Sequence, residues 1–319
     1  TTAASGAWSM YAVVYDATAD VLTPSNVSIG FDISSSASTN TLSGITENSR
    51  MVAWNLDGTK LITSSVQGNL RQYNLSTAYD ISSATFSNNS ASATPGGQAP
   101  SFDLAGTKLL GYNSTSAASS TLAYRTLSTA FDISTISSGF TTAASSLTDF
   151  THSSMSPDGN YILFSKNDIT TRVWTYPLST TGDVTTMNTS GKVQSATLSS
   201  LGNQGGTIAN VRFSADGTKV FVLGGVGWQT SYGYLEEYPL STPWVVSSMG
   251  TRTQNRPMAG VSNTGRGLTF TPDGTSILLS TYNASGASLD NIYQYSSSSS
   301  TAATGYQVST SNVDTTHWD

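Results

Sequence analysis

Residues able to perform acid–base or metal chemistry are scarce in this chain of 319 residues. The two histidines are His152 and His317, and glutamate occurs only at Glu47, Glu236 and Glu237. Cysteine is absent, which excludes disulfides, thiolate metal sites and cysteine nucleophiles. Two histidines cannot supply a three-histidine metal site, and no Gly-x-Ser-x-Gly sequence offers a serine nucleophile. We therefore predict no catalytic residue, no metal site and no cofactor.

Most of the recognisable aspartates recur at two positions of a repeated pattern. One group directly precedes a glycine, and the other group stands in the sequence Asp-Ile-Ser. The members of the two groups are Asp57, Asp158, Asp216 and Asp273, and then Asp32, Asp80 and Asp132. Asp in such positions accepts backbone N–H bonds and caps its own turn. Because a catalytic carboxylate is needed once rather than in every repeat, we interpret these residues as structural.

The adjacent glutamates Glu236 and Glu237 stand apart from this pattern, since they precede Tyr238 in an apparent strand. Successive side chains of a strand point to opposite faces, so we expect only one of the two carboxylates to face solvent.

The aspartate–glycine turns belong to a repeat of about fifty residues. In each unit an aromatic residue or Met is followed four positions later by the turn glycine, and then by an apolar run. The turn glycines, which lie 48, 53, 58 and 57 residues apart, are Gly58, Gly106, Gly159, Gly217 and Gly274. Asp-Gly between two hydrophobic runs predicts a β-hairpin, because glycine accepts the positive φ of a tight turn.

A second motif follows later in each unit. Its first copy covers residues 73–82 and reads Tyr-Asn-Leu-Ser-Thr-Ala-Tyr-Asp-Ile-Ser. Further copies begin at Tyr124, Tyr176 and Tyr238, and Phe31 begins a copy of the end of the motif before the first turn. We interpret the recurring tyrosines as residues that pack the repeats together.

The chain therefore holds five full units and one opening unit that lacks its first strand. Dividing 319 residues by a period of about 53 gives about six units. We predict an all-β fold, a single β-propeller of about six four-stranded blades, with seven as the alternative number. The missing strand is expected from residues 306–313, so that the N- and C-terminal segments share a blade. Residues 1–40 are then an opening partial blade, 41–300 five repeat units, and 301–319 a closing strand and tail.

The Phe-Ser-x-Asp-Gly-Thr-Lys turn at residues 213–219 resembles the turns of WD-like and YVTN-type β-propellers. The longer Tyr-x-Leu-Ser-Thr-Ala-Tyr/Phe-Asp-Ile-Ser element is similar to repeats of propeller-containing virion and tail-associated proteins of marine bacteriophages, and of related bacterial surface proteins. The resemblance covers nearly the whole chain. It implies a structural or host-recognition role on the surface of a particle, and it provides no catalytic residue to carry over.

The charge of the chain limits the kinds of partner that it can bind. The net charge is −6 and the 13 Lys and Arg residues are scattered, which argues against nucleic acid as a partner. No stretch approaches the length of a transmembrane helix, so we expect no membrane insertion. Charged residues make up only 10% of the chain, with Ser and Thr in their place, and this composition favours an extracellular or virion-surface location.

One group of candidate ligand-binding residues begins the innermost strands, seven or eight residues before the turn glycines. Its members are Arg50, Gln98, His152, Asn210 and Arg266. They are polar while the following positions are apolar, as expected near the wet mouth of a central channel. They either solvate the channel or form a site for a small anion or a sugar.

A second candidate is the extended Gly-rich loop after Gly224, with the aromatic residues Trp228, Tyr232 and Tyr234. Loops carry binding function on rigid scaffolds, and a flat aromatic ring beside small polar residues suits a sugar face. The same composition also suits packing against a neighbouring subunit.

We predict a non-catalytic structural and binding propeller on a virion or cell surface, as a phage tail or fibre component that aids host recognition. Its partners would be other virion or surface proteins and host-surface glycans. Two alternatives stay open, a secreted bacterial adhesin or lectin and a metal-dependent lactonase-like enzyme acting in the channel.

Overall fold

Each predicted turn joins the first two strands of a four-stranded sheet. The turn glycines Gly58, Gly106, Gly159, Gly217 and Gly274 have φ values of 71°, 68°, 72°, 70° and 69°. The strands before and after each turn pair in antiparallel register. The predicted hairpins are thus confirmed, and glycine is required because its φ is positive at every one of these turns.

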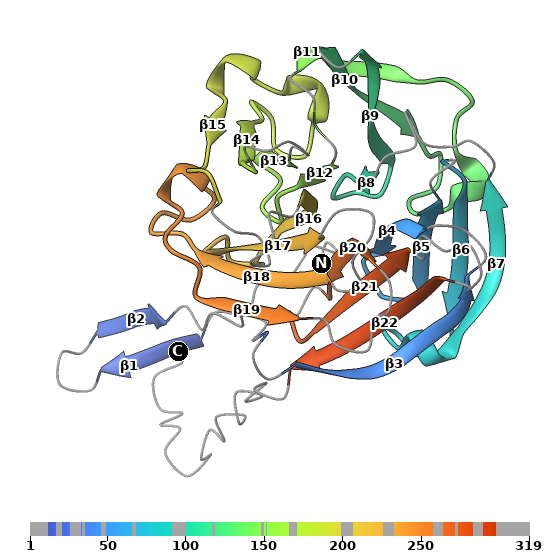
Figure 1. The fold of residues 1–319 in the computed structure, drawn as a ribbon, viewed down its shortest axis with the longest axis horizontal. Helices are drawn as coiled ribbons and strands as arrows, with labels where there is room; N and C mark the ends of the chain where they lie inside the picture. Colours follow the sequence, from blue (N-terminus) through green and yellow to red (C-terminus); the bar gives the residue numbers. More distant parts are fainter. Residues whose placement is uncertain are drawn as a thin grey trace, which may run out of the picture.

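Five such antiparallel sheets surround a central axis and form a five-bladed β-propeller (Figure 1). The first blade contains β4 (Ser49–Trp54), β5 (Lys60–Ser65), β6 (Leu70–Leu75) and β7 (Ala84–Ser90). The second contains β8 (Ser101–Phe102), β9 (Lys108–Ser116), β10 (Ser119–Thr126) and β11 (Thr141–Leu147). The third contains β12 (His152–Met155), β13 (Tyr161–Ser165), β14 (Val173–Pro177) and β15 (Val193–Gln194). The fourth contains β16 (Thr207–Phe213), β17 (Lys219–Gly225), β18 (Gly233–Pro239) and β19 (Gln254–Pro257).

The fifth blade is built from both ends of the sequence. It contains β20 (Thr264–Phe270), β21 (Ser276–Tyr282) and β22 (Asp290–Ser297), and its outer strand is β3 (Ser36–Ile45). β22 and β3 pair over seven registered positions, from Asp290↔Ile45 to Ser297↔Ser36. Figure 1 shows these two strands, coloured for opposite ends of the chain, lying side by side. The ring is therefore closed by main-chain hydrogen bonds.

The prediction of about six blades is wrong, because there are five. The opening unit does not form a blade of its own. Ile33 packs between the fourth and fifth blades, and the strand β3 that follows it joins β20, β21 and β22 as the outer strand of their sheet. The prediction of a single all-β propeller with four-stranded blades is confirmed.

The computed structural model describes residues 12–16, 21–25, 33, 36–45, 49–65, 68–90, 100–116, 119–147, 150, 152–165, 171–198, 207–225, 233–257, 264–271, 274–282 and 290–297. The closing strand expected at residues 306–313 lies outside these residues. β1 (Ala12–Asp16) and β2 (Val21–Ser25) form a separate antiparallel hairpin.

The core consists of five clusters of buried apolar side chains, one at each boundary between neighbouring blades. Each cluster receives one Ile or Val from the Asp-Ile-Ser position of the later blade. These side chains, all with 0% exposure, are Ile81, Ile133, Val184, Val246 and Ile33. The recurring Tyr73, Tyr176, Tyr238 and Tyr295 are also buried in these clusters. Burial of this kind contributes roughly 1.5–3 kcal/mol per side chain.

Aspartate fixes the short turn that presents this side chain. Asp80, Asp132 and Asp183 cap the 3₁₀ turns η1 (Ile81–Ser83), η3 (Ile133–Thr135) and η4 (Val184–Thr186) by accepting from the backbone N–H two residues on. In the hairpins, Asp57 and Asp216 accept from the backbone N–H of Thr59 and Thr218 at 2.9 and 3.0 Å. The structural interpretation is confirmed for Asp57, Asp80, Asp132, Asp158 and Asp216. Asp32 and Asp273 lie outside the described residues.

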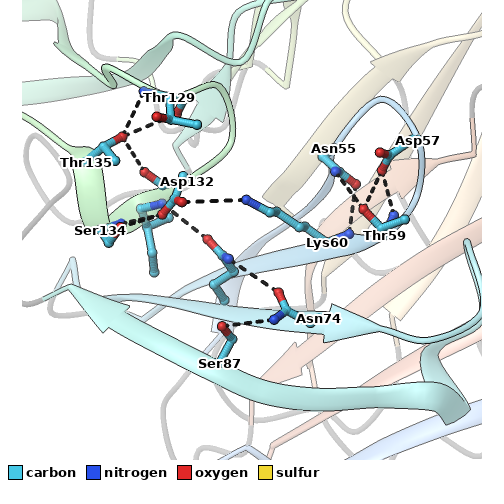
Figure 2. A network of polar contacts seen from close by, with 12 residues as sticks. Asn55, Asp57, Thr59, Lys60, Asn74, Ser87, Thr129, Asp132, Ser134 and Thr135 are labelled. Carbon is cyan, nitrogen blue, oxygen red and sulfur yellow. Dashed lines mark hydrogen bonds and ion pairs between the residues drawn. The ribbon is translucent and has the colours of Figure 1, made fainter.

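Polar side chains of one blade also hold the turn of the next. Gln294 of the fifth blade donates to the carbonyl of Tyr79 at 2.9 Å and accepts from the N–H of Ile81 at 3.2 Å. Between the first two blades, Lys60 lies 3.8 Å from Asp132, a contact drawn in Figure 2. The partly exposed ion pair contributes little to the free energy of unfolding. The hydrogen bond that Gln294 accepts from the backbone N–H of Ile81 does stabilise the blade boundary.

An aromatic ring covers three of the turn glycines. Tyr79, Phe131 and Trp244 have positive φ values of 59°, 52° and 66°, and their N–H groups donate to the carbonyls of Gly58, Gly106 and Gly217 at 2.9 Å. A Cβ at any of these three glycines would overlap the ring above it. The third blade has Gly182 at this position, which adopts the same φ range without strain.

We predict that Gly106→Ala destabilises the protein by about 2–4 kcal/mol, because the new Cβ meets a positive φ and the Phe131 ring. The matched control is Gly139→Ala, since a Cβ at Gly139 contacts nothing within 4 Å. Urea unfolding of both variants measures the difference. Equal stabilities of the two variants would show that the ring does not pack on this glycine.

Candidate functional site

The two faces of the propeller are built differently. One face, which we name the turn face, carries the five-residue turns at 55–59, 103–107, 156–160, 214–218 and 271–275 together with the 3₁₀ turns. At the opposite face, the loop face, the second strand of a blade ends and the third begins, and each blade ends and the next begins. The strand registers require this, since Thr207, Gly225 and Gly233 pair at one end of the fourth blade and Phe213 and Val220 at the other. The segments on the loop face vary in length from blade to blade.

Arg50 and Arg266 lie near the loop-face end of the inner strands β4 and β20. Each occupies a break in strand register, between Ser49 and Met51 in β4 and between Gly265 and Gly267 in β20. Ala209 occupies the same kind of break in β16. These are β-bulges, in which one extra residue leaves the ladder and re-aims the side chains around it. Both arginines are half-buried.

His152 and Asn210 lie one position deeper, at the places facing Ser165 and Leu223 in their own hairpins. Both are buried, with 1% exposure each. Asn210 donates to the carbonyl of Arg266 at 3.1 Å and so links two inner strands, whereas both ring nitrogens of His152 lack a hydrogen-bond partner among the described residues.

The structure adds Arg212, two residues beyond Asn210 on β16. Its Nε donates to the carbonyl of Leu268 at 3.0 Å, and its Nη1 is buried without a partner among the described residues. Desolvation lowers the pKa of Arg212 to about 10. Burial, and then the charge of Arg212, hold the pKa of His152 well below 6.5. The structure therefore brings His152, Asn210 and Arg212 together.

Sequence reasoning missed Arg212, although a signal was present. Arg212 stands five residues before its turn glycine, where the other four repeats have Ala53, Ser101, Ser154 and Thr269. A single long charged side chain among small ones at one repeat position marks a departure from the structural pattern.

Of the three aromatic residues predicted in the Gly-rich loop, the structure describes only Tyr234. Trp228, Tyr232 and Gln98 lie outside the described residues, so their roles stay predictions. Tyr234 is half-buried at the start of β18, where it faces Gly224 and Pro257. This end of β18 belongs to the loop face. Tyr234 thus lies on the same face of the propeller as the bulges that carry Arg50 and Arg266.

Both glutamates of β18 are buried, with 0% exposure for Glu236 and 3% for Glu237, so the expectation that one faces solvent is wrong. The physical reason is that each has a cation. Glu236 pairs with Arg252 and accepts from the Tyr238 hydroxyl at 2.6 Å, and Glu237 pairs with Lys219 at 3.1 Å. Burial and this carboxylate raise the pKa of Tyr238.

A cavity of 560 Å³ adjoins this arrangement. Residues 196–198 of the third blade and residues 249–252 of the fourth line it, together with Tyr238. Of the residues that line this cavity Arg252 is charged, and it forms an ion pair with Glu236.

No group of three or more His, Asp or Glu residues that could hold a metal ion occurs within the described parts of the chain. No helix in those parts is long and apolar enough to cross a membrane.

Many solved protein chains match this chain in structure. The chain is similar to the β-propeller domain of Cps50 (Swd1) from Myceliophteria thermophila, with a TM-score of 0.45 and 13% identity. The match covers 82% of this chain and 99% of that domain. No protein-family model matches the chain, and the search of curated proteins found no match.

The buried histidine predicts a pH dependence of stability. Because the pKa of His152 is lower in the folded than in the unfolded protein, the unfolded state binds the proton first, and stability falls as the pH drops below 6.5. The loss is about 1.4 kcal/mol per pH unit, or up to about 2 kcal/mol at pH 5. In His152→Asn, which copies Asn210 of the next repeat, this part of the loss should vanish.

Urea unfolding at pH 7 and pH 5, in a low-salt chloride buffer, measures the effect. The control is His317→Asn, which removes the other histidine and should keep the wild-type pH dependence. An unchanged pH dependence in His152→Asn would mean that His152 titrates alike in the folded and unfolded states.

Proposed function

We propose that this chain is a non-catalytic binding propeller displayed on the surface of a virion or cell, as a tail or fibre component that aids host recognition. In this proposal the loop face contacts the partner and the turn face holds the blades together. The partners are other virion or surface proteins and glycans of the host surface.

The observation that carries this proposal is the difference between the two faces. The described aspartates of the turn face accept hydrogen bonds from their own turns, and their side chains are used for capping. The loop face has connecting segments that differ in length from blade to blade. Binding residues are commonly found on such variable segments, positioned by a rigid scaffold.

Two further observations support a surface location. The repeat element resembles those of phage virion and tail-associated propellers, and only 10% of the residues are charged. A Ser- and Thr-rich surface of this kind offers many hydroxyl groups for contact with neighbouring proteins or sugars.

A secreted bacterial adhesin or lectin is the second candidate. It is favoured by the Gly-rich sequence that holds Trp228 and Tyr232 and leads into Tyr234 at the loop face. An aromatic ring stacks on the C–H groups of a sugar, while neighbouring Ser and Gln side chains can meet its hydroxyls.

We predict that the purified protein binds host cells or a defined set of glycans, and that Trp228→Ala weakens this binding at least about tenfold, because one stacked ring contributes about 1.4 kcal/mol or more. A glycan array and a panel of marine bacterial cells provide the measurement. The matched control is Phe86→Ala, which removes an aromatic ring with 57% exposure from the outer strand β7.

Binding to whole particles or cells without any glycan signal would favour the tail or fibre role, and a glycan signal lost only in Trp228→Ala would favour the lectin. Protein that neither associates with particles nor binds cells or glycans would contradict both. Tail or capsid genes next to the gene for this chain would favour the tail or fibre component over the secreted lectin.

A further inference from the structure

The inner strands β12 and β16 are neighbours in the ring and carry polar side chains at alternating positions. Three of these side chains donate to the carbonyls of the next inner strand. Ser154 donates to Val211 at 3.2 Å, Asn210 to Arg266 at 3.1 Å and Arg212 to Leu268 at 3.0 Å. Such bonds link blade to blade around the axis. They account for only part of the hydrogen-bonding capacity that these residues have.

Several buried polar groups of these inner strands lack a hydrogen-bond partner among the described residues. Nη1 of Arg212 and both ring nitrogens of His152 have no partner among the described residues, and Ser101 leaves its hydroxyl unmet on the inner strand β8. β12 contacts both β8 and β16, so these groups line one side of the ring. Buried donors normally have a protein, solvent or ligand partner.

The charge is also uncompensated. Within the described part of the chain, Arg212 forms no ion pair, in contrast to Lys60, Lys108, Lys219 and Arg252. A buried cation without a counter-ion is strongly disfavoured. Arg212 as a whole is partly accessible, and its Nη1 is the buried atom, so its surroundings favour an anion that can reach it. His152 has 1% exposure, so only a small ligand can contact both side chains.

We propose that Arg212, together with His152, binds a small oxyanion of the size of a carboxylate inside the ring. The guanidinium offers N–H donors in a planar fork that matches two oxygens of one anion, and the imidazole adds a further donor. This site is independent of any attachment through the loop face.

Arg212 is the charged group that faces His152. The strands packed on β12 are β8, β9, β13 and β16, and outside β16 the only charged residue among them is Lys108, which pairs with Asp183 at 3.2 Å. An anion held by Arg212 neutralises the charge that faces His152 and so favours protonated His152. Binding should therefore tighten as the pH falls from 7.5 to 5.5.

The experiment compares acetate, inorganic phosphate and chloride, as sodium salts at equal ionic strength and pH 6, on the purified full chain. In the wild type, acetate or phosphate should raise the melting temperature above the chloride value by about 3–6 °C at a hundredfold excess over the dissociation constant. The same anions should shift the imidazole NMR signal of His152, which is identified by its loss in His152→Asn. A response to acetate alone assigns a carboxylate, and a response to phosphate alone assigns an inorganic oxyanion.

Arg212→Gln should abolish both responses, because it removes the charge and the fork while keeping a polar side chain of similar reach. The matched control is Arg125→Gln, whose guanidinium lies 4.0 Å above the Phe140 ring on the outer part of the second blade, and which should respond as the wild type does. If Arg212→Gln does not fold, the wild-type NMR titration still tests the site. Equal effects of chloride, acetate and phosphate on the wild type, or an unchanged response in Arg212→Gln, would overturn the proposal and leave solvent as the partner of these donors.

Discussion

The whole ring depends on one contact, the insertion of an Ile or Val from a turn into the apolar face of the preceding blade. A four-stranded sheet cannot bury both of its faces by itself, so each blade is stable only between two neighbours. The contact occurs five times, with Ile81, Ile133, Val184, Val246 and Ile33 completely buried. The last of these explains the closure, because Ile33 comes from the beginning of the chain and packs between the fourth and fifth blades.

Much of this architecture could be predicted from the sequence. The Asp-Gly turns, their glycine φ and the capping aspartates follow from local rules, since two or three residues determine each turn. The number of blades does not follow from the same rules. A repeat can be divided at any of its strands, and the pattern around Phe31 cannot show whether it opens a new blade or completes the last one. That choice is made by the pairing of β3 with β22, which joins residues 245 to 261 positions apart.

The candidate site, too, could be predicted from the sequence only in part. The polar residues before the turn glycines were found by spacing alone, and spacing cannot show a β-bulge. The bulges take Arg50, Ala209 and Arg266 out of the ladder, whereas His152 and Asn210, one residue nearer their turn glycines, are paired within it. Arg212 was missed because polarity was sought at the mouth of the channel, whereas the unpaired charge lies further along the inner strand. The pairing of Glu236 with Arg252 was likewise invisible to strand alternation, because it depends on a segment that folds back beside β18.

The central claim is that the N-terminal strand closes the fifth blade, and the absence of cysteine makes it directly testable. Thr41 and Tyr293 face each other across β3 and β22. The double variant Thr41→Cys and Tyr293→Cys should form an intramolecular disulfide on mild oxidation, because the Cα atoms of directly opposed antiparallel residues lie about 4.5–5.5 Å apart, within the Cα–Cα range of disulfides. A control with Thr41→Cys and Thr126→Cys, which places the second cysteine on the second blade, should not. Mass spectrometry of the oxidised proteins reads the outcome. A disulfide in the first variant alone is the predicted result, and its absence there would contradict a five-bladed ring closed by β3.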